Sequence, residues 1–239
     1  TAIADLQRAL LGLGYPADTL QDGTPTGAYK GQTHQGVVAF QQRNGLTVSG
    51  VADSATQSKL FAGGAAPFST PVAELPAGEG MLGVPAAASV QLQHWYNTVK
   101  GKLRSGNILR ITHPRSGISY NLRVYSPNYH MDAEPATFRD TQLMNRAFGH
   151  DPAWIIEVVY VQLPDGSWSL ATTHNYPHMS WSIKDNGFGG HLCVHFLRDM
   201  DETRKNSGDY SVDHQWAIRR AWKNMTGQAV DDATNPEEY

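Results

Sequence analysis

The sequence has one cysteine, no basic stripe and no long apolar run. Each of these features argues against one kind of bond or partner. Its 239 residues include one cysteine, so no disulfide can form within the chain. Basic and acidic residues number 19 and 22 and are mixed along the sequence, without the basic stripe that attracts a phosphate backbone. No apolar run approaches the roughly 20 residues that cross a bilayer. We therefore expect neither nucleic acid nor a membrane span.

Residues 1–61 show the pattern of a small helical unit. Apolar residues of the first helix recur at helical spacing, at Ile3, Leu6, Leu10 and Leu13. The stretch THQGVVAFQQRNGL at 33–46 predicts a second amphipathic helix with Thr33 as its N-cap. A third short helix is expected after a turn, capped by Asp53 or Ser54.

Four motifs in this unit occur in a familiar order. LQRALLGLGY, DG, GQTHQGVVAFQQRNGL and GVADSATQSKLF together resemble the peptidoglycan-binding type 1 domain. The resemblance implies a three-helix module over residues 1–62 that binds cell-wall muropeptides in a groove between its helices. The implied partners are peptidoglycan glycan strands and stem peptides. The implied location is extracellular and associated with the cell wall.

The rest of the chain has a different character, so we expect a multidomain protein. Residues 63–88 are rich in Ala, Gly and Pro and predict a linker, whereas 229–239 is an acidic tail. Between them, 89–228 is expected to form a mainly β, sandwich-like α+β domain. Its predicted strands are 107–113 paired with 118–126, 153–163 paired with 168–175, and 191–197. Its predicted helices are 89–103, 137–149 and 211–225.

The single cysteine lies in the stretch GGHLCVHFLRD, residues 189–199. In a strand, alternate residues share a face, so His191, Cys193 and His195 are expected to point the same way. His178 precedes Cys193 by 15 residues, and the Gly-rich turn between them can bring the two side chains together. A thiol beside an imidazole loses its proton more readily and becomes a nucleophile for acyl transfer. A small buried cysteine without chemistry is the alternative interpretation.

The spacing of His178 and the GHLCVH stretch resembles the signature of YkuD-type L,D-transpeptidases. Carried over by position, Cys193 matches the nucleophile, His178 the general base and His191 the second histidine, and His195 falls where the family has Arg or Asn. The sequence departs from the family motif at Met179, Gly190 and Leu192. The resemblance implies that a thiolate attacks a stem-peptide carbonyl. An amine or water then resolves the thioester, which gives L,D-transpeptidase or L,D-carboxypeptidase activity without a cofactor.

Further residues complete this site and suggest a rival to it. Gly190, His195, Tyr176 and Trp181 are expected to bind substrate. Alternatively, His130, Asp132 and Glu134 share one face of an extended segment. Together with the candidate ligands His178, His191, Cys193 or His195, they can hold zinc. That donor set predicts a zinc-dependent peptidoglycan peptidase or amidase. A third interpretation is a wall-binding protein without catalysis.

Overall fold

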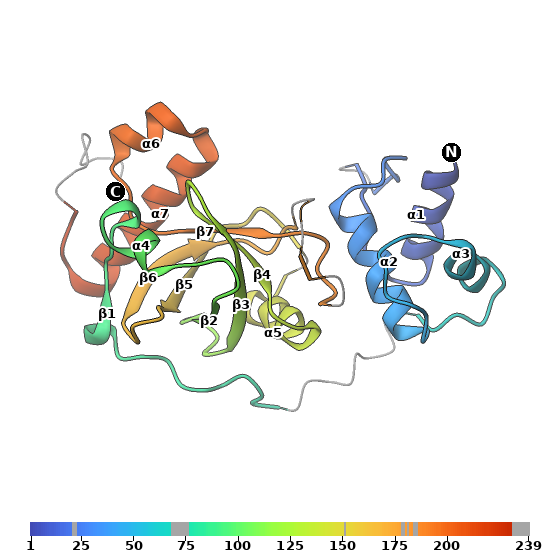
Figure 1. Cartoon of the computed structure of the whole chain (residues 1–239), viewed down its shortest axis with the longest axis horizontal. Coiled ribbons are helices and arrows are strands. Elements are labelled where there is room, and N and C mark those ends of the chain that lie inside the picture. Colours follow the sequence, from blue (N-terminus) through green and yellow to red (C-terminus); the bar gives the residue numbers. More distant parts are fainter. Residues whose placement is uncertain are drawn as a thin grey trace. The chain divides into compact units, whose positions relative to one another are not determined.

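The computed structural model describes residues 1–20, 23–67, 77–150, 152–177, 180, 182–183 and 186–230 (Figure 1). The chain folds into two compact units. The first comprises Thr1–Ala77, Glu134–Gln142 and Pro177–His191, and the second comprises Gly78–Ala133, Leu143–Tyr176 and Leu192–Tyr239. The domain limits predicted at residues 62 and 89 stay predictions, and residues 231–239 of the expected tail lie outside the described residues.

The first unit contains the helices α1 (Ala2–Gly12), α2 (Gly31–Arg43) and α3 (Ser54–Phe61). Tyr15 packs edge-on against Phe40 with ring centroids 5.4 Å apart. Apolar residues of all three helices meet in one cluster. The first helix contributes Leu6 and Leu10, two of the residues whose spacing predicts it. The buried members of the cluster are Leu6, Leu10, Tyr15, Val37, Ala39, Phe40 and Leu60.

The capping groups of α2 and α3 differ in their sequence distance from the helix that they cap. Asp53 caps α3 as predicted, with its carboxylate accepting the N–H of Thr56. Thr33 is not an N-cap, because α2 already begins at Gly31. Instead, the buried carboxylate of Asp18 accepts the N–H groups of Lys30 and Thr33, each at 3.0 Å. The start of α2 is therefore satisfied by a residue from a preceding loop.

The second unit is built on seven strands of one sheet, in the order β1-β6-β5-β2-β3-β4-β7. The two predicted hairpins are confirmed by register: Ile108 pairs with Arg123, and Glu157 with Thr173. The strand bounds are β1 (Val90–Gln91), β2 (Ile108–Thr112), β3 (Ser119–Pro127), β4 (Met131–Pro135), β5 (Glu157–Gln162), β6 (Trp168–Thr173) and β7 (Leu192–His195).

Strand β7 closes this sheet into a six-stranded barrel. It pairs antiparallel with β4, where Cys193 is opposite Asp132, and also with β6, where His195 is opposite Thr172. The sandwich-like arrangement expected from the sequence is therefore wrong in detail, because one sheet closes on itself and its edge strands become each other's partners. Closure places both faces of β7 out of solvent, and all four of its residues are buried.

The helices of the second unit differ in part from those predicted. The expected helix over 89–103 is shorter, because Val90 and Gln91 pair with β6 and only η2 (Trp95–Val99) and α4 (Lys100–Lys102) are helical. A short turn of helix, η1 (Ala87–Ser89), precedes them. The other helices are α6 (Met200–Asn206), α7 (Asp209–Thr226) and α5 (Phe138–Phe148), which belongs to the second unit only from Leu143 onward.

Helix α7 packs against β5, β6 and β7 (Figure 1). Its Gln215 fixes the chain just after β7: the side chain donates to the carbonyl of Phe196 at 2.9 Å and accepts the N–H of Arg198 at 2.7 Å. Arg219 adds a bond to the Arg198 carbonyl at 3.0 Å. These buried bonds hold α7 in a set position beside β7.

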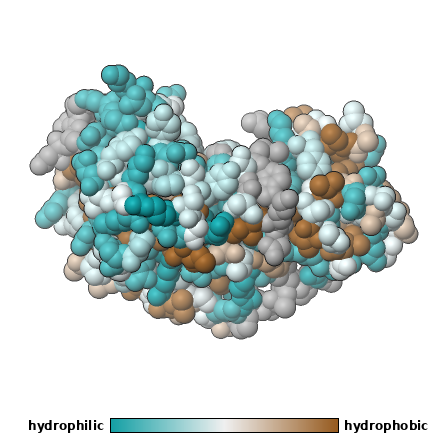
Figure 2. Space-filling model, in the orientation of Figure 1, coloured by the Kyte–Doolittle hydropathy of each residue, from teal (hydrophilic) through white to brown (hydrophobic). Residues whose placement is uncertain are grey.

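None of the described helices is long and apolar enough to cross a membrane. On the face drawn in Figure 2, hydrophobic residues gather in small separate patches between hydrophilic ones. Exposed apolar side chains of this scattered kind are ordinary on a protein surface.

Candidate functional site

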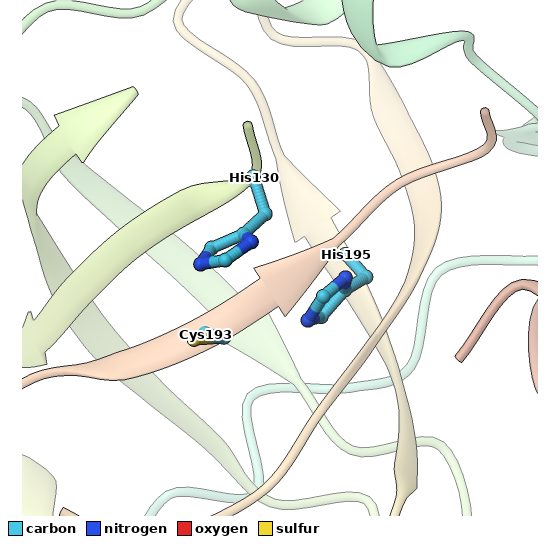
Figure 3. A group of neighbouring side chains, drawn as sticks. All are labelled: His130, Cys193 and His195. Atoms are coloured by element: carbon cyan, nitrogen blue, oxygen red, sulfur yellow. The ribbon is translucent and has the colours of Figure 1, made fainter. Parts of the chain in front are cut away.

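Three potential ligand atoms meet inside the barrel unit. His130 lies directly before β4, and Cys193 and His195 lie two positions apart on β7, so they share one face of that strand. One ligand atom from each residue lies within 4.8 Å of the other two. Figure 3 shows the two imidazole rings side by side over the strand that carries the cysteine. We call His130, Cys193 and His195 the β7 cluster.

The nitrogens of His195 have no hydrogen-bond partner among the described residues, although the side chain is buried. The ring stacks on His214 with centroids 3.9 Å apart and 16° between planes. His214 shares a hydrogen bond between its Nδ1 and the hydroxyl of Thr172 at 2.8 Å. Burial and the neighbouring His130 lower the pKa of His214 to about 3, and burial also lowers the pKa of His195. Both rings are therefore neutral at pH 7, the form in which imidazole binds metals.

Asp132 lies beside the other two members of the cluster. Its Oδ1 is 2.9 Å from Nε2 of His130 and 3.9 Å from Sγ of Cys193. A carboxylate that accepts an N–H from one ring nitrogen fixes the tautomer and leaves the other nitrogen as an electron-pair donor. This pair gives His130 a defined orientation.

The environment of Cys193 favours the neutral thiol. Burial, followed by the charge and hydrogen bond of Asp132, raises the pKa of the Cys193 thiol. Nucleophilic cysteines have the opposite surroundings, a low pKa near cations or a helix N-terminus. A bound cation reverses this, because a coordinating thiol gives up its proton. The local electrostatics therefore suit a metal ligand better than an unassisted nucleophile.

The other residues expected for acyl transfer are placed as follows. His191 precedes β7, and its Nδ1 lies 2.8 Å from the carbonyl oxygen of Ser180. Gly190 has a φ of 153°, a conformation that L side chains rarely adopt. His178 and Trp181 lie outside the described residues. The predicted roles of these residues in catalysis and substrate binding stay predictions.

Glu134 and Tyr176 have contacts of their own. The carboxylate of Glu134 accepts the backbone N–H groups of Ser182 and Ile183, the second at 2.7 Å. It thereby holds a loop and is not part of the β7 cluster. Tyr176 stacks on Trp154 with centroids 4.9 Å apart and 22° between planes.

Three further side chains surround the cluster, and none of them belongs to a motif that the sequence analysis identified: His174, Tyr210 and His214. His174 Nε2 accepts the N–H of Cys193 at 3.3 Å, and the Tyr210 ring lies 6.2 Å from that of His195. The available signal was a histidine on a helix face, in the DHQ stretch of α7. Its meaning depends on how α7 packs, which local sequence does not encode.

Comparison with known proteins bears on the first unit alone. No curated protein matches the chain, and no solved structure matches it. Residues 1–60 match the family model described as "Putative peptidoglycan binding domain". This match supports a peptidoglycan-binding domain at the N-terminal end of the sequence, in a protein related to the cell wall.

Proposed function

We propose that the protein is a zinc-dependent hydrolase of amide bonds in peptidoglycan, with zinc held by His130, Cys193 and His195. The observation that carries the proposal is the convergence of these ligand atoms within 4.8 Å, in a buried place where the nitrogens of His195 lack any hydrogen-bond partner among the described residues. A buried polar atom without a partner costs about 1–3 kcal/mol, and a metal ligand bond would remove that cost.

The donor set favours zinc over harder cations. Zinc binds imidazole nitrogen and thiolate sulfur in tetrahedral sites, whereas Ca²⁺ and Mg²⁺ take oxygen ligands. Three protein ligands leave a fourth position, and that open position distinguishes catalytic from structural zinc sites. The residues present thus fit a catalytic zinc ion, which when bound lowers the pKa of a water molecule and polarises a carbonyl.

Two residues beside the proposed zinc ligands, Asp132 and Tyr210, have roles of their own in the proposed reaction. Asp132 orients His130 through their 2.9 Å contact. Tyr210 presents a buried hydroxyl with no hydrogen-bond partner among the described residues. Burial, then Cys193 and Asp213, raises the pKa of Tyr210, so the phenol keeps its proton. It can therefore donate to the oxygen that becomes negative when a carbonyl is attacked.

The proposed substrate class is supported by residues 1–60, which match the family model of a putative peptidoglycan binding domain. The proposed reaction adds water across an amide: the C–N bond breaks, hydroxide joins the carbonyl carbon, and a proton goes to the leaving amine. The cysteine acyl-transfer mechanism expected from the sequence differs from it in one testable respect. There Cys193 would form a covalent thioester, whereas here it stays a ligand.

The test uses the full chain and purified muropeptides. We expect about one zinc per chain by elemental analysis, release of new amine termini by mass spectrometry, loss of release with a chelator, and recovery on adding zinc. Chelator-resistant turnover, accompanied by a carbapenem adduct on Cys193, would contradict the proposal and support acyl transfer. Absence of both zinc and turnover would also contradict it and leave a wall-binding protein.

A further inference from the structure

The stacked rings of Trp154 and Tyr176 form an aromatic pair near the β7 cluster in the second unit. Tyr176 is half-buried, whereas Trp154 is 45% exposed and the residue after it, Ile155, is 51% exposed. A single exposed apolar residue needs no explanation. Trp154, however, is ordered by several rings at once. It stacks on Tyr176 and lies 4.7 Å from the His174 ring and 5.2 Å, edge to face, from the Tyr210 ring.

The backbone under this pair is also fixed. The N–H of Ala153 donates to Oδ1 of Asn175 at 2.9 Å. Asn175 is fully buried, and its amide nitrogen donates to Asn145 at 3.1 Å. Trp154 is therefore held with part of its indole facing solvent, before any ligand arrives. A side chain ordered in advance loses little entropy on binding.

The aromatic pair and the β7 cluster share a neighbour. The Tyr210 ring contacts Trp154 on one side and lies 6.2 Å from the His195 ring on the other. Trp154 and the β7 cluster are thus connected through one ring, that of Tyr210. In the same chain, residues 1–60 match a family that binds a polymer of sugar rings carrying peptides.

We propose that Trp154 and Tyr176 form a subsite for one N-acetylated pyranose ring of peptidoglycan, beside the β7 cluster. A pyranose presents C–H groups on one flat face, which suits the electron-rich face of an indole, while its hydroxyls stay in water. The binding part stands independently of the proposed hydrolysis. Its consequence for substrate choice rests on that function: the stem joined to the stacked sugar would start beside the metal ligands, so sugar-bearing muropeptides should be preferred over free stem peptides.

Binding is tested without turnover, on the chelator-treated full chain and with N-acetylglucosamine tetramer as the probe. Residues 1–60 contain no tryptophan, so indole N–H signals in NMR spectra do not report on the peptidoglycan-binding domain. The Trp154 signal is assigned by its loss in Trp154→Phe. We expect it to shift saturably with the sugar. A Trp154 signal that does not move at saturating sugar would overturn the proposal.

A variant series separates stacking from apolar contact. Trp154→Ala should raise the Kd followed through the remaining indole and Tyr176 signals by about tenfold, the factor that corresponds to one aromatic contact. Trp154→Phe keeps a ring and should lose less. Ile155→Ala removes an equally exposed apolar side chain next to it and should change nothing. Equal losses in Trp154→Ala and Ile155→Ala would contradict a stacking subsite.

Steady-state kinetics test the expected preference for sugar-bearing muropeptides over free stem peptides. In Trp154→Ala, KM for a sugar-bearing muropeptide should rise about tenfold with kcat nearly unchanged, and KM for the same sugar-free stem peptide should stay constant. An equal rise for both substrates would show that the pair holds peptide, against the proposal. If no substrate is turned over, the proposed hydrolysis fails, while the NMR titration still decides the sugar subsite.

Discussion

Two histidine clusters in the second unit differ in whether they carry their own counter-charge. In the Glu157 cluster, formed by Glu157, His113, His150 and Arg115, the carboxylate lies 3.3 Å from His113, 3.4 Å from His150 and 3.0 Å from Arg115. In the β7 cluster the buried nitrogens of His195 have no such partner among the described residues. In the first arrangement the carboxylate contacts both histidines and forms an ion pair with Arg115, whereas in the second the nitrogens of His195 are available to a ligand.

This difference indicates which of two clusters of similar composition can bind a metal ion. Both contain two histidines beside a carboxylate. In the Glu157 cluster that carboxylate is central and faces every other group. In the β7 cluster Asp132 contacts His130 and the thiol, and His195 faces another neutral ring, that of His214. A set of electron-pair donors without a cation among them is what a metal ion completes.

The largest expected effect comes from removing one donor of the β7 cluster. His195→Ala should lose stoichiometric zinc and reduce muropeptide hydrolysis to background, because two ligands do not retain a catalytic zinc ion. The matched control is His150→Ala in the Glu157 cluster, which should keep both. Elemental analysis after gel filtration and a turnover assay measure the contrast. Equal zinc retention in the two variants would remove the distinction between the clusters.

A smaller effect is expected at the phenol beside the β7 cluster. Tyr210→Phe removes one proposed donor to the developing oxyanion and should lower kcat by about 10²–10³-fold, with zinc content unchanged. Steady-state kinetics and elemental analysis on the same preparation test this. An unchanged kcat would show that the buried hydroxyl has no part in the reaction.

Sequence alone was sufficient for the first helix and both hairpins and insufficient for the site. Periodic leucines gave the first helix, and alternation gave both hairpins, because these patterns act over neighbouring residues. The barrel depends on β7 pairing with both β4 and β6, strands distant in sequence. Likewise, Asp18 rather than Thr33 satisfies the start of α2. Contacts of this kind are fixed by tertiary packing, which overrides local propensity.

The candidate site shows the same limit. Alternation along the strand placed Cys193 and His195 on one face, and the zinc alternative included His130 and Asp132. The stacking of His214 on His195 and the approach of Tyr210 depend on the docking of α7, held by Gln215. Leu192, a departure from the transpeptidase motif, is fully buried opposite Ala133 and belongs to the core. Its size therefore reflects packing of the barrel.

In the Glu157 cluster the expected effect is on stability. Glu157→Gln removes the charge that faces His113 and Arg115 and should lower the free energy of unfolding by about 1.5–3 kcal/mol, the range for hydrogen bonds to charged groups. Zinc content and KM should not change. Urea unfolding of wild type and variant, followed by circular dichroism, gives the measurement. A loss of zinc in this variant would mean that the two clusters are not separate.

The smallest effect is a pH dependence of stability from His113. Burial lowers the pKa of His113 below its ordinary 6.5, although Glu157 opposes the shift. The unfolded chain therefore takes up this proton first as the pH falls below about 6.5, so acidification destabilises the fold. His113→Asn should show a shallower loss of unfolding free energy between pH 6.5 and 5 than wild type. Identical slopes would exclude a contribution from His113.

The central claim is that Cys193 is a metal ligand, and cobalt spectroscopy tests it most directly. Co²⁺ replaces Zn²⁺ in tetrahedral sites, and a thiolate ligand adds a sulfur-to-cobalt charge-transfer band in the near ultraviolet. Because the chain has one cysteine, that band can arise only from Cys193. We predict the band at one cobalt per chain and its loss in Cys193→Ser. Cobalt binding without the band, or no binding at all, would contradict the account.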